Sequence, residues 1–206
     1  MDLQRILISV PGIILGFTVH EYCHAFAAYK LGDTTAKDDG RLTFNPIKHI
    51  DIIGLVFIII AGFGWAKPVQ FNPDMLKKPK RDTAIIAAVG PLSNLILGVL
   101  FLFAIKLLLP VVDNTTIDIL DFIITVLYYW SFLNIGLFVF NMIPIPPLDG
   151  SHIFLSGLNI SRETENKIMR VGSSLLIIIL VIQNIANVNI LPIGKIVVKI
   201  IFLILG

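Results

Sequence analysis

The amino-acid sequence predicts an all-α integral membrane protein: a multi-helix transmembrane bundle with a short β-hairpin or re-entrant element after the first helix. Composition and the spacing of charges predict this class. Of the 206 residues, 56% are hydrophobic and only 15% are charged, whereas soluble domains have about 25% charged residues. Three long runs contain no charged residue, and each reaches the roughly 20 residues that cross a bilayer. These runs are 83–105, 122–148 and 171–194.

We expect a single membrane-embedded domain over residues 1–206, because no repeat, low-complexity tail or long linker divides the chain. The predicted helices are 6–29, 83–109, 119–143, 171–187 and 192–205. The net charge of +2 is too small to predict nucleic acid as a partner. We expect no signal peptide, since the first apolar segment runs into a polar motif instead of a cleavage site.

The stretch after the first helix predicts a short strand or hairpin arm. In GRLTFNPIK, Leu42 and Phe44 alternate with Arg41 and Thr43, which is the period of a β-strand. The uncharged run 52–66 that follows has only 15 residues. This length favours a re-entrant or interfacial element over a full crossing.

Basic residues distinguish the two sides of the membrane. If 52–66 only dips into the bilayer, nine Lys and Arg residues between 30 and 82 share one face, while the loop 110–118 contains none. Positive residues favour the cytosolic side. We therefore expect a multi-pass protein of the cytoplasmic membrane with its active site toward the cytosol. If 52–66 crossed instead, the basic residues would be divided between both faces.

The sequence VHEYCH in the first apolar segment indicates a metal site. Residues four apart lie on one face of a helix, so His20 and His24 can direct ring nitrogens at one ion, with Glu21 beside them. H-E-x-x-H is the spacing of zinc hydrolases, in which the glutamate takes a proton from water on the metal. Polar packing or chance would also produce so short a motif. Ionisable groups inside an apolar span, however, are costly and usually functional.

A hydrolytic zinc site needs a third protein ligand, and Asp149 follows directly after the longest uncharged run. Pro144, Pro146 and Pro147 prevent a regular helix before it, and we expect Gly150 to permit an unusual turn. An ordinary turn at the membrane surface would also contain such prolines. The predicted location of Asp149 on the same side of the membrane as the two histidines favours the metal site.

Three ordered motifs resemble those of the site-2 protease family of intramembrane zinc metalloproteases. They are HEYCH, GPLSN ending at Asn94, and NMIPIPPLDG beginning at Asn141. The last matches the family pattern N-x-x-P-x-x-x-L-D-G in full. LGD, GRLTFNPIKHID and GWAKPV also resemble the short prokaryotic branch of this family, which has no PDZ or CBS domain. One departure is His152, which stands where relatives often have Arg, so its role is open.

The resemblance implies one zinc ion per chain, bound by the two histidines of HEYCH and by Asp149, with Glu21 as catalytic base. It also implies that Asn94 and Asn141 lie near the site, as candidate contacts to the transition state or substrate. The implied activity is hydrolysis of a peptide bond in or near a transmembrane helix. The implied substrates are single-pass membrane proteins, such as an anti-sigma factor, or membrane-tethered regulatory proteins.

Cleavage requires an unwound substrate, whose unpaired backbone groups are costly in lipid. A strand edge of the protease would pair with it. We therefore expect Arg41, Leu42, Thr43 and Phe44, together with the dipping segment 52–66, to form a substrate clamp.

Two other functions remain compatible with a zinc motif: a zinc-binding membrane transporter and a non-catalytic scaffold. A transporter should have ionisable residues at mid-membrane on several helices, but 83–105 and 171–194 contain none. The intact Glu21 argues against a scaffold. We expect Cys23 and His49 to be packing or structural residues, because neither fits the ligand pattern.

The orientation is testable by labelling single cysteines in intact cells. Cysteines placed in 113–118 should react with a membrane-impermeant reagent added outside, and cysteines placed in 77–81 should not. The reverse pattern would overturn the predicted orientation.

Overall fold

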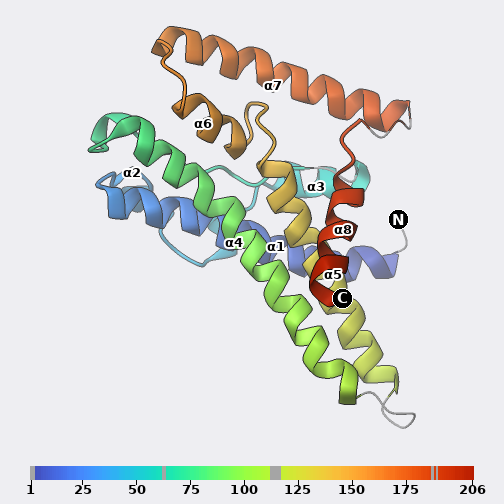
Figure 1. Ribbon diagram of the computed structural model, residues 1–206. Helices are drawn as coiled ribbons and strands as arrows, with labels where there is room; N and C mark the ends of the chain where they lie inside the picture. Colours follow the sequence, from blue (N-terminus) through green and yellow to red (C-terminus); the bar gives the residue numbers. More distant parts are fainter. Residues whose placement is uncertain (1–2, 62–63, 112–116, 187, 189) are drawn as a thin grey trace.

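The computed structural model describes residues 3–61, 64–111, 117–186, 188 and 190–206. These residues form α-helices and short 3-10 turns but no β-strand (Figure 1). The helices are α1 (Leu3–Leu31), α2 (Thr35–Asp38), α3 (Ile52–Ala61), α4 (Pro79–Leu108), α5 (Ile117–Asn141), α6 (Asp149–Ser156), α7 (Arg162–Ile185) and α8 (Ile193–Leu205). The prediction of an all-helical protein is therefore confirmed for this part of the chain.

Three of these helices are long and apolar enough to cross a membrane. The candidate spans are Gln4–Leu31 in α1, Pro79–Leu108 in α4 and Ile119–Asn141 in α5, with 28, 30 and 23 residues. At about 1.5 Å per residue, each is longer than the roughly 30 Å of a bilayer's hydrocarbon core. The chain is thus a multi-pass membrane protein.

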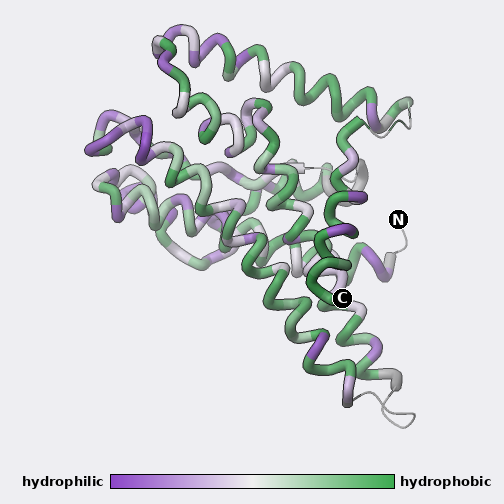
Figure 2. Tube along the Cα trace, viewed as in Figure 1, coloured by the Kyte–Doolittle hydropathy of each residue, from purple (hydrophilic) through white to green (hydrophobic). Residues whose placement is uncertain are grey.

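Helix α4 lies at the centre of the bundle and packs against α1, α5 and α6 (Figure 1). Leu102, Ile135 and Val197, from α4, α5 and α8, are fully buried in one apolar cluster. Other large apolar side chains of α4 stay exposed, as lipid contact requires: Ile96, Leu100, Phe103 and Leu107. Figure 2 shows α4 and α5 as hydrophobic over most of their lengths.

Helices α1 and α5 approach closely at Gly12. A Cβ added at Gly12 would lie 2.8 Å from Cγ of Trp130. The Trp130 indole N–H donates to the carbonyl of Ile8 at 2.8 Å. Pro11 lies inside α1 without ending it. This contact fixes α5 beside the helix that carries both histidines.

The predicted β-hairpin is wrong for the described residues. A lone antiparallel bridge joins Ile50 to Ala66. The local reason is the Asn-Pro pair: the Asn45 side chain accepts the N–H of Ile47 at 3.1 Å and begins the 3-10 turn Pro46–Lys48. Pro46 suits the start of such a turn because its φ is fixed and it has no N–H to satisfy. An alternating pattern does not produce a strand without a neighbour to pair with.

Arg41 and Phe44 brace this loop. Arg41 is only 7% exposed, and its guanidinium donates to the carbonyls of Lys48 and Lys67. Burial lowers the pKa of the Arg41 guanidinium from its usual value. The ring of Phe44 stacks on Tyr22 of α1, with centroids 3.8 Å apart. The loop is therefore fixed to α1 and to the segment that follows α3.

Helix α3 has 10 residues, which gives a length of about 15 Å, too short to cross a bilayer. A Cβ added at Gly54 would lie 3.0 Å from the backbone nitrogen of Trp65, so the chain returns directly against this helix. Residues 62 and 63 of the predicted re-entrant segment lie outside the described residues. Whether 52–66 enters the bilayer stays a prediction.

Helix α7 lies on the far side of α6 from α1 (Figure 1). Its first residue, Arg162, forms an exposed ion pair with Asp74, which lowers the pKa of that carboxyl group. Lys80 Nζ donates to the carbonyl of Leu158 in the linker before α7, at 3.0 Å. These surface contacts tie the start of α7 to the residues around the beginning of α4. Exposed ion pairs contribute little to stability.

Candidate metal centre

Helix α1 presents two imidazoles to one point. His20 and His24 are one turn apart and are 6% and 7% exposed. Their rings meet edge to face, with centroids 4.6 Å apart, and their Nε2 atoms are 2.9 Å apart. The α-helical spacing of the motif therefore places both Nε2 atoms at a shared position.

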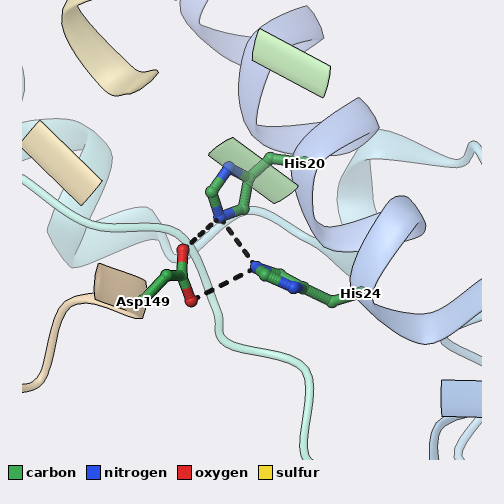
Figure 3. Close-up of side chains that lie close together, drawn as sticks. All are labelled: His20, His24 and Asp149. Atoms are coloured by element: carbon green, nitrogen blue, oxygen red, sulfur yellow. Dashed lines mark hydrogen bonds and ion pairs between the residues drawn. The ribbon is translucent and has the colours of Figure 1, made fainter. Parts of the chain in front are cut away.

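Asp149, the first residue of α6, completes the group (Figure 3). Its Oδ2 lies 3.1 Å from Nε2 of His20, and its Oδ1 lies 3.5 Å from Nε2 of His24. The three side chains offer ligand atoms that all lie within 4.8 Å of one another. Asp149 follows His24 by 125 positions and His20 by 129 in sequence, yet its carboxylate meets both imidazoles.

Asp149 reaches the histidines because the chain after α5 folds back tightly. Residues 142–148 form turns, as the three prolines predict. A Cβ added at Gly150 would lie 2.7 Å from the carbonyl oxygen of Ile143 and closer still to that of Met142. Gly150 is not among the glycines with positive φ. Glycine is needed here for close backbone approach, and the expectation of an unusual turn was wrong.

Hydrogen bonds at Nδ1 orient both imidazoles. Nδ1 of His24 lies 2.7 Å from the carbonyl of Ile86, and Nδ1 of His20 lies 2.6 Å from Oδ1 of Asn94. Both partners are oxygens that only accept, so each Nδ1 carries a hydrogen, and each imidazole in its neutral form has its lone pair on Nε2. Such outer hydrogen bonds select the metal-binding tautomer of histidine.

This arrangement fits a zinc ion. With both imidazoles neutral, two Nε2 lone pairs face each other beside the Asp149 carboxylate, so three electron-rich atoms converge on one point. Electron-rich atoms at such short distances repel unless a cation lies among them. Two imidazoles and one carboxylate form a donor set of hydrolytic zinc sites, which leave a further coordination position open. The residues present therefore match the metal that the motif predicted.

Glu21 lies beside the group without belonging to it. It is 6% exposed, and its Oε2 accepts the backbone N–H of Val69 at 2.7 Å. Glu21, the two histidines and Asp149 all line one cleft of about 1400 Å³. The carboxylate is thus fixed by the loop after α3 and faces the same space as the ligand atoms.

Gly90 of α4 packs directly against the imidazoles. A Cβ added there would lie 2.9 Å from Nε2 of His20 and closer still to Nε2 of His24. In the sequence, Gly90 is recognisable only as the first residue of the motif GPLSN. The steric requirement becomes visible only when α4 is placed on α1.

The other candidates have different positions. Asn94 is fully buried behind His20, whereas Asn141 lines the cleft and donates to the carbonyl of Leu137 at 3.0 Å. His152 also lines the cleft and contacts Phe71 edge to face, and burial lowers the pKa of its imidazole.

Three other predicted features lie outside the cleft. His49 is fully buried in the loop before α3, where Nε2 contacts the carbonyl of Thr43 at 2.7 Å and burial lowers the pKa of its imidazole. Cys23 is half-buried on α1 and does not join the metal-ligand group. None of the four clamp residues 41–44 lines the cleft. The structure thus separates the braced loop from the site.

Comparisons with known proteins agree with this geometry. The family model described as Peptidase family M50 matches residues 110–182, which include Asp149. The Bacillus subtilis protein YwhC, provisionally named a zinc metalloprotease, is 44% identical over 147 residues, which are 68% of this chain and 64% of YwhC. The chain is thus similar to peptidase family M50 over residues 110–182 and, over a longer stretch, to a protein named as a zinc metalloprotease.

Two further relatives are more distant. Rip2 of Mycolicibacterium smegmatis is 29% identical over 150 residues, 70% of this chain and 54% of Rip2. MJ0611 of Methanocaldococcus jannaschii is 29% identical over 149 residues, 71% of this chain and 69% of that protein. Both have names that assign them provisionally to the zinc metalloproteases. The chain spans about half to two thirds of the length of YwhC and Rip2. No solved structure gives a significant match.

The role of Gly90 is testable by substitution with alanine. Because the added methyl group would occupy the space beside both Nε2 atoms, Gly90→Ala should lose bound zinc, measured by elemental analysis of the purified protein. The matched control is Gly136→Ala on α5, where the nearest atom to an added Cβ is 3.9 Å away. Full zinc content in Gly90→Ala would contradict this description of the site.

Proposed function

We propose that this protein is a zinc-dependent intramembrane protease, which hydrolyses a peptide bond in or near a transmembrane helix of another protein. The observation that carries this proposal is the meeting of His20, His24 and Asp149 beside Glu21 in one cleft. The match of residues 110–182 to peptidase family M50 and the names of the relatives support peptide hydrolysis and zinc.

The depth of the site supports action within the membrane. His20 lies 11 residues before the end of α1 at Leu31, which is about 17 Å along a helix. Half of the hydrocarbon core of a bilayer is about 15 Å. If α1 crosses the bilayer, the ligand atoms lie well below the membrane surface, where a transmembrane substrate is found.

The chain's own groups have distinct tasks in this reaction. A zinc ion, when bound, supplies Lewis acidity that acidifies water and polarises a carbonyl group. His20, His24 and Asp149 would hold the ion, and Glu21 would accept the proton of the attacking water and pass it to the departing amine. Val69 keeps the Glu21 carboxylate turned into the cleft through its N–H. Asn141, at the cleft wall, is a candidate donor to the developing oxyanion.

Residues 66–71 are better positioned than the predicted clamp residues 41–44 to provide a backbone edge that pairs with the substrate. Ala66, Pro68, Val69, Gln70 and Phe71 all line the cleft. The N–H groups of Lys67 and Val69 are bonded to His49 and Glu21. The N–H of Gln70 has no partner within the described residues. We place the edge that pairs with an unwound substrate here, since added-strand pairing uses such free backbone groups.

Single-pass membrane proteins and membrane-tethered regulatory proteins are the proposed substrates, because their helices can enter a cleft within a bilayer. The proposed location is the cytoplasmic membrane with the metal centre toward the cytosol. The concentration of basic residues on the loops around the cleft supports this orientation.

Glu21→Gln tests the enzyme directly. The variant should keep its zinc and lose about 100-fold or more in cleavage of a transmembrane peptide reconstituted with it in lipid, because the general base is gone. Glu163→Gln is the control, since Glu163 forms only an exposed pair with Lys167. Equal cleavage by both variants would reject Glu21 as the base, whereas zinc-loaded wild-type protein that cleaves no peptide would favour a transporter or a scaffold.

Gln70→Pro tests the substrate edge, because proline removes the free N–H. Cleavage should slow about tenfold, the effect of one backbone hydrogen bond, while zinc content stays at the wild-type level. Gln70→Ala keeps the N–H and serves as the matched control. If the two variants cleave equally fast, 66–71 is not the pairing edge.

A further inference from the structure

Two buried asparagines connect the metal centre to α5. Asn94 on α4 and Asn134 on α5 are both 0% exposed, and neither lines the cleft. Burying a primary amide in an apolar bundle is costly unless its groups are paired. Asn94 belongs to a motif that the sequence singled out, whereas no motif contains Asn134.

The hydrogen bonds of the two asparagine side chains determine which amide atom donates and which accepts. Asn134 Nδ2 donates to the carbonyl of Trp130 at 2.9 Å. This leaves Asn134 Oδ1 to accept from Asn94 Nδ2, at 3.1 Å. Asn94 Nδ2 also donates to the carbonyl of Gly16, at 3.0 Å. Both hydrogens of the Asn94 amide are therefore used, and its Oδ1 must face Nδ1 of His20.

We propose that Asn134 is a positioning residue of the metal centre. By fixing the orientation of the Asn94 amide, it keeps the hydrogen of His20 on Nδ1 and the Nε2 lone pair directed at the ion. This inference rests on the proposed zinc site. The proposed role concerns His20 alone, because a backbone carbonyl, that of Ile86, orients His24.

Gly16 gives independent support. A Cβ at Gly16 would lie 2.7 Å from Oδ1 of Asn134. The absence of a side chain on α1 therefore allows the Asn134 amide to approach Asn94. The bundle thus accommodates this polar contact beside the first metal ligand.

The competing explanation is that Asn134 only joins α5 to its neighbours, as polar residues do in membrane bundles. Ser131 is the matched control. It lies one turn away on α5, is also 0% exposed, and donates to the carbonyl of Gly98 on α4 at 2.9 Å. It joins the same two helices but has no connection to His20.

The experiment measures zinc affinity of the purified protein by competition with a chelator, and thermal unfolding of the metal-free protein. Asn134→Leu should raise the zinc Kd about tenfold, at the lower end of outer-shell effects. Ser131→Ala should stay within about twofold of wild type, since it alters only helix contact. In the Asn94→Ala background, Asn134→Leu should cause no further loss of affinity, because it acts through Asn94.

Asn134→Ala also removes the oxygen toward Asn94 with a smaller change of side chain; it should show the same loss of zinc affinity and serves if the leucine variant does not fold. Three results would overturn the inference: wild-type affinity in Asn134→Leu, an equal loss in Ser131→Ala, or additive losses in the double variant. A wild-type protein that binds zinc but cleaves no membrane peptide would reject the protease and leave this inference standing. Wild-type protein without zinc would reject both.

Discussion

The structure depends on two imidazole Nε2 atoms that face each other 2.9 Å apart beside a carboxylate, inside an apolar bundle. When both imidazoles are neutral, these atoms require a cation among them. The surrounding helices serve this requirement in different ways. Helix α1 supplies the two nitrogens, the turn after α5 delivers Asp149, and α4 supplies the oxygens that hold the imidazole hydrogens away from the centre.

Sequence patterns predicted the elements that rest on local chemistry. The long uncharged runs predicted helices, the four-residue spacing of His20 and His24 predicted a shared face, and the proline-rich turn before Asp149 predicted a break in the helix. The hairpin failed because a strand needs a partner, which local alternation cannot supply. Gly90, Ile86 and Asn134 could not be assigned from spacing, since their roles arise only where separate helices touch. The sequence singled out Gly150 correctly, but glycine is needed there for close backbone approach and not for an unusual turn.

The loop after α3 connects two parts of the proposed reaction. Val69 donates its N–H to Glu21, and its neighbours form the wall along which a substrate would lie. The base and the substrate wall are therefore held by the same stretch of backbone. Arg41 anchors that stretch from behind, through Lys67, so a buried cation outside the cleft helps to determine where the base points.

Gly90 also has a consequence for how the bundle assembles in the lipid. The contact between this glycine and both rings permits only one alignment of α4 on α1: sliding by a single residue, about 1.5 Å along the axis with a turn of 100°, would bring a bulkier neighbour onto the imidazoles. Helices that insert separately and associate afterwards would thus capture an ion only after reaching this alignment. Metal capture would then act as a check on correct assembly, and the bound ion would join α1 to α6, which carry its ligands.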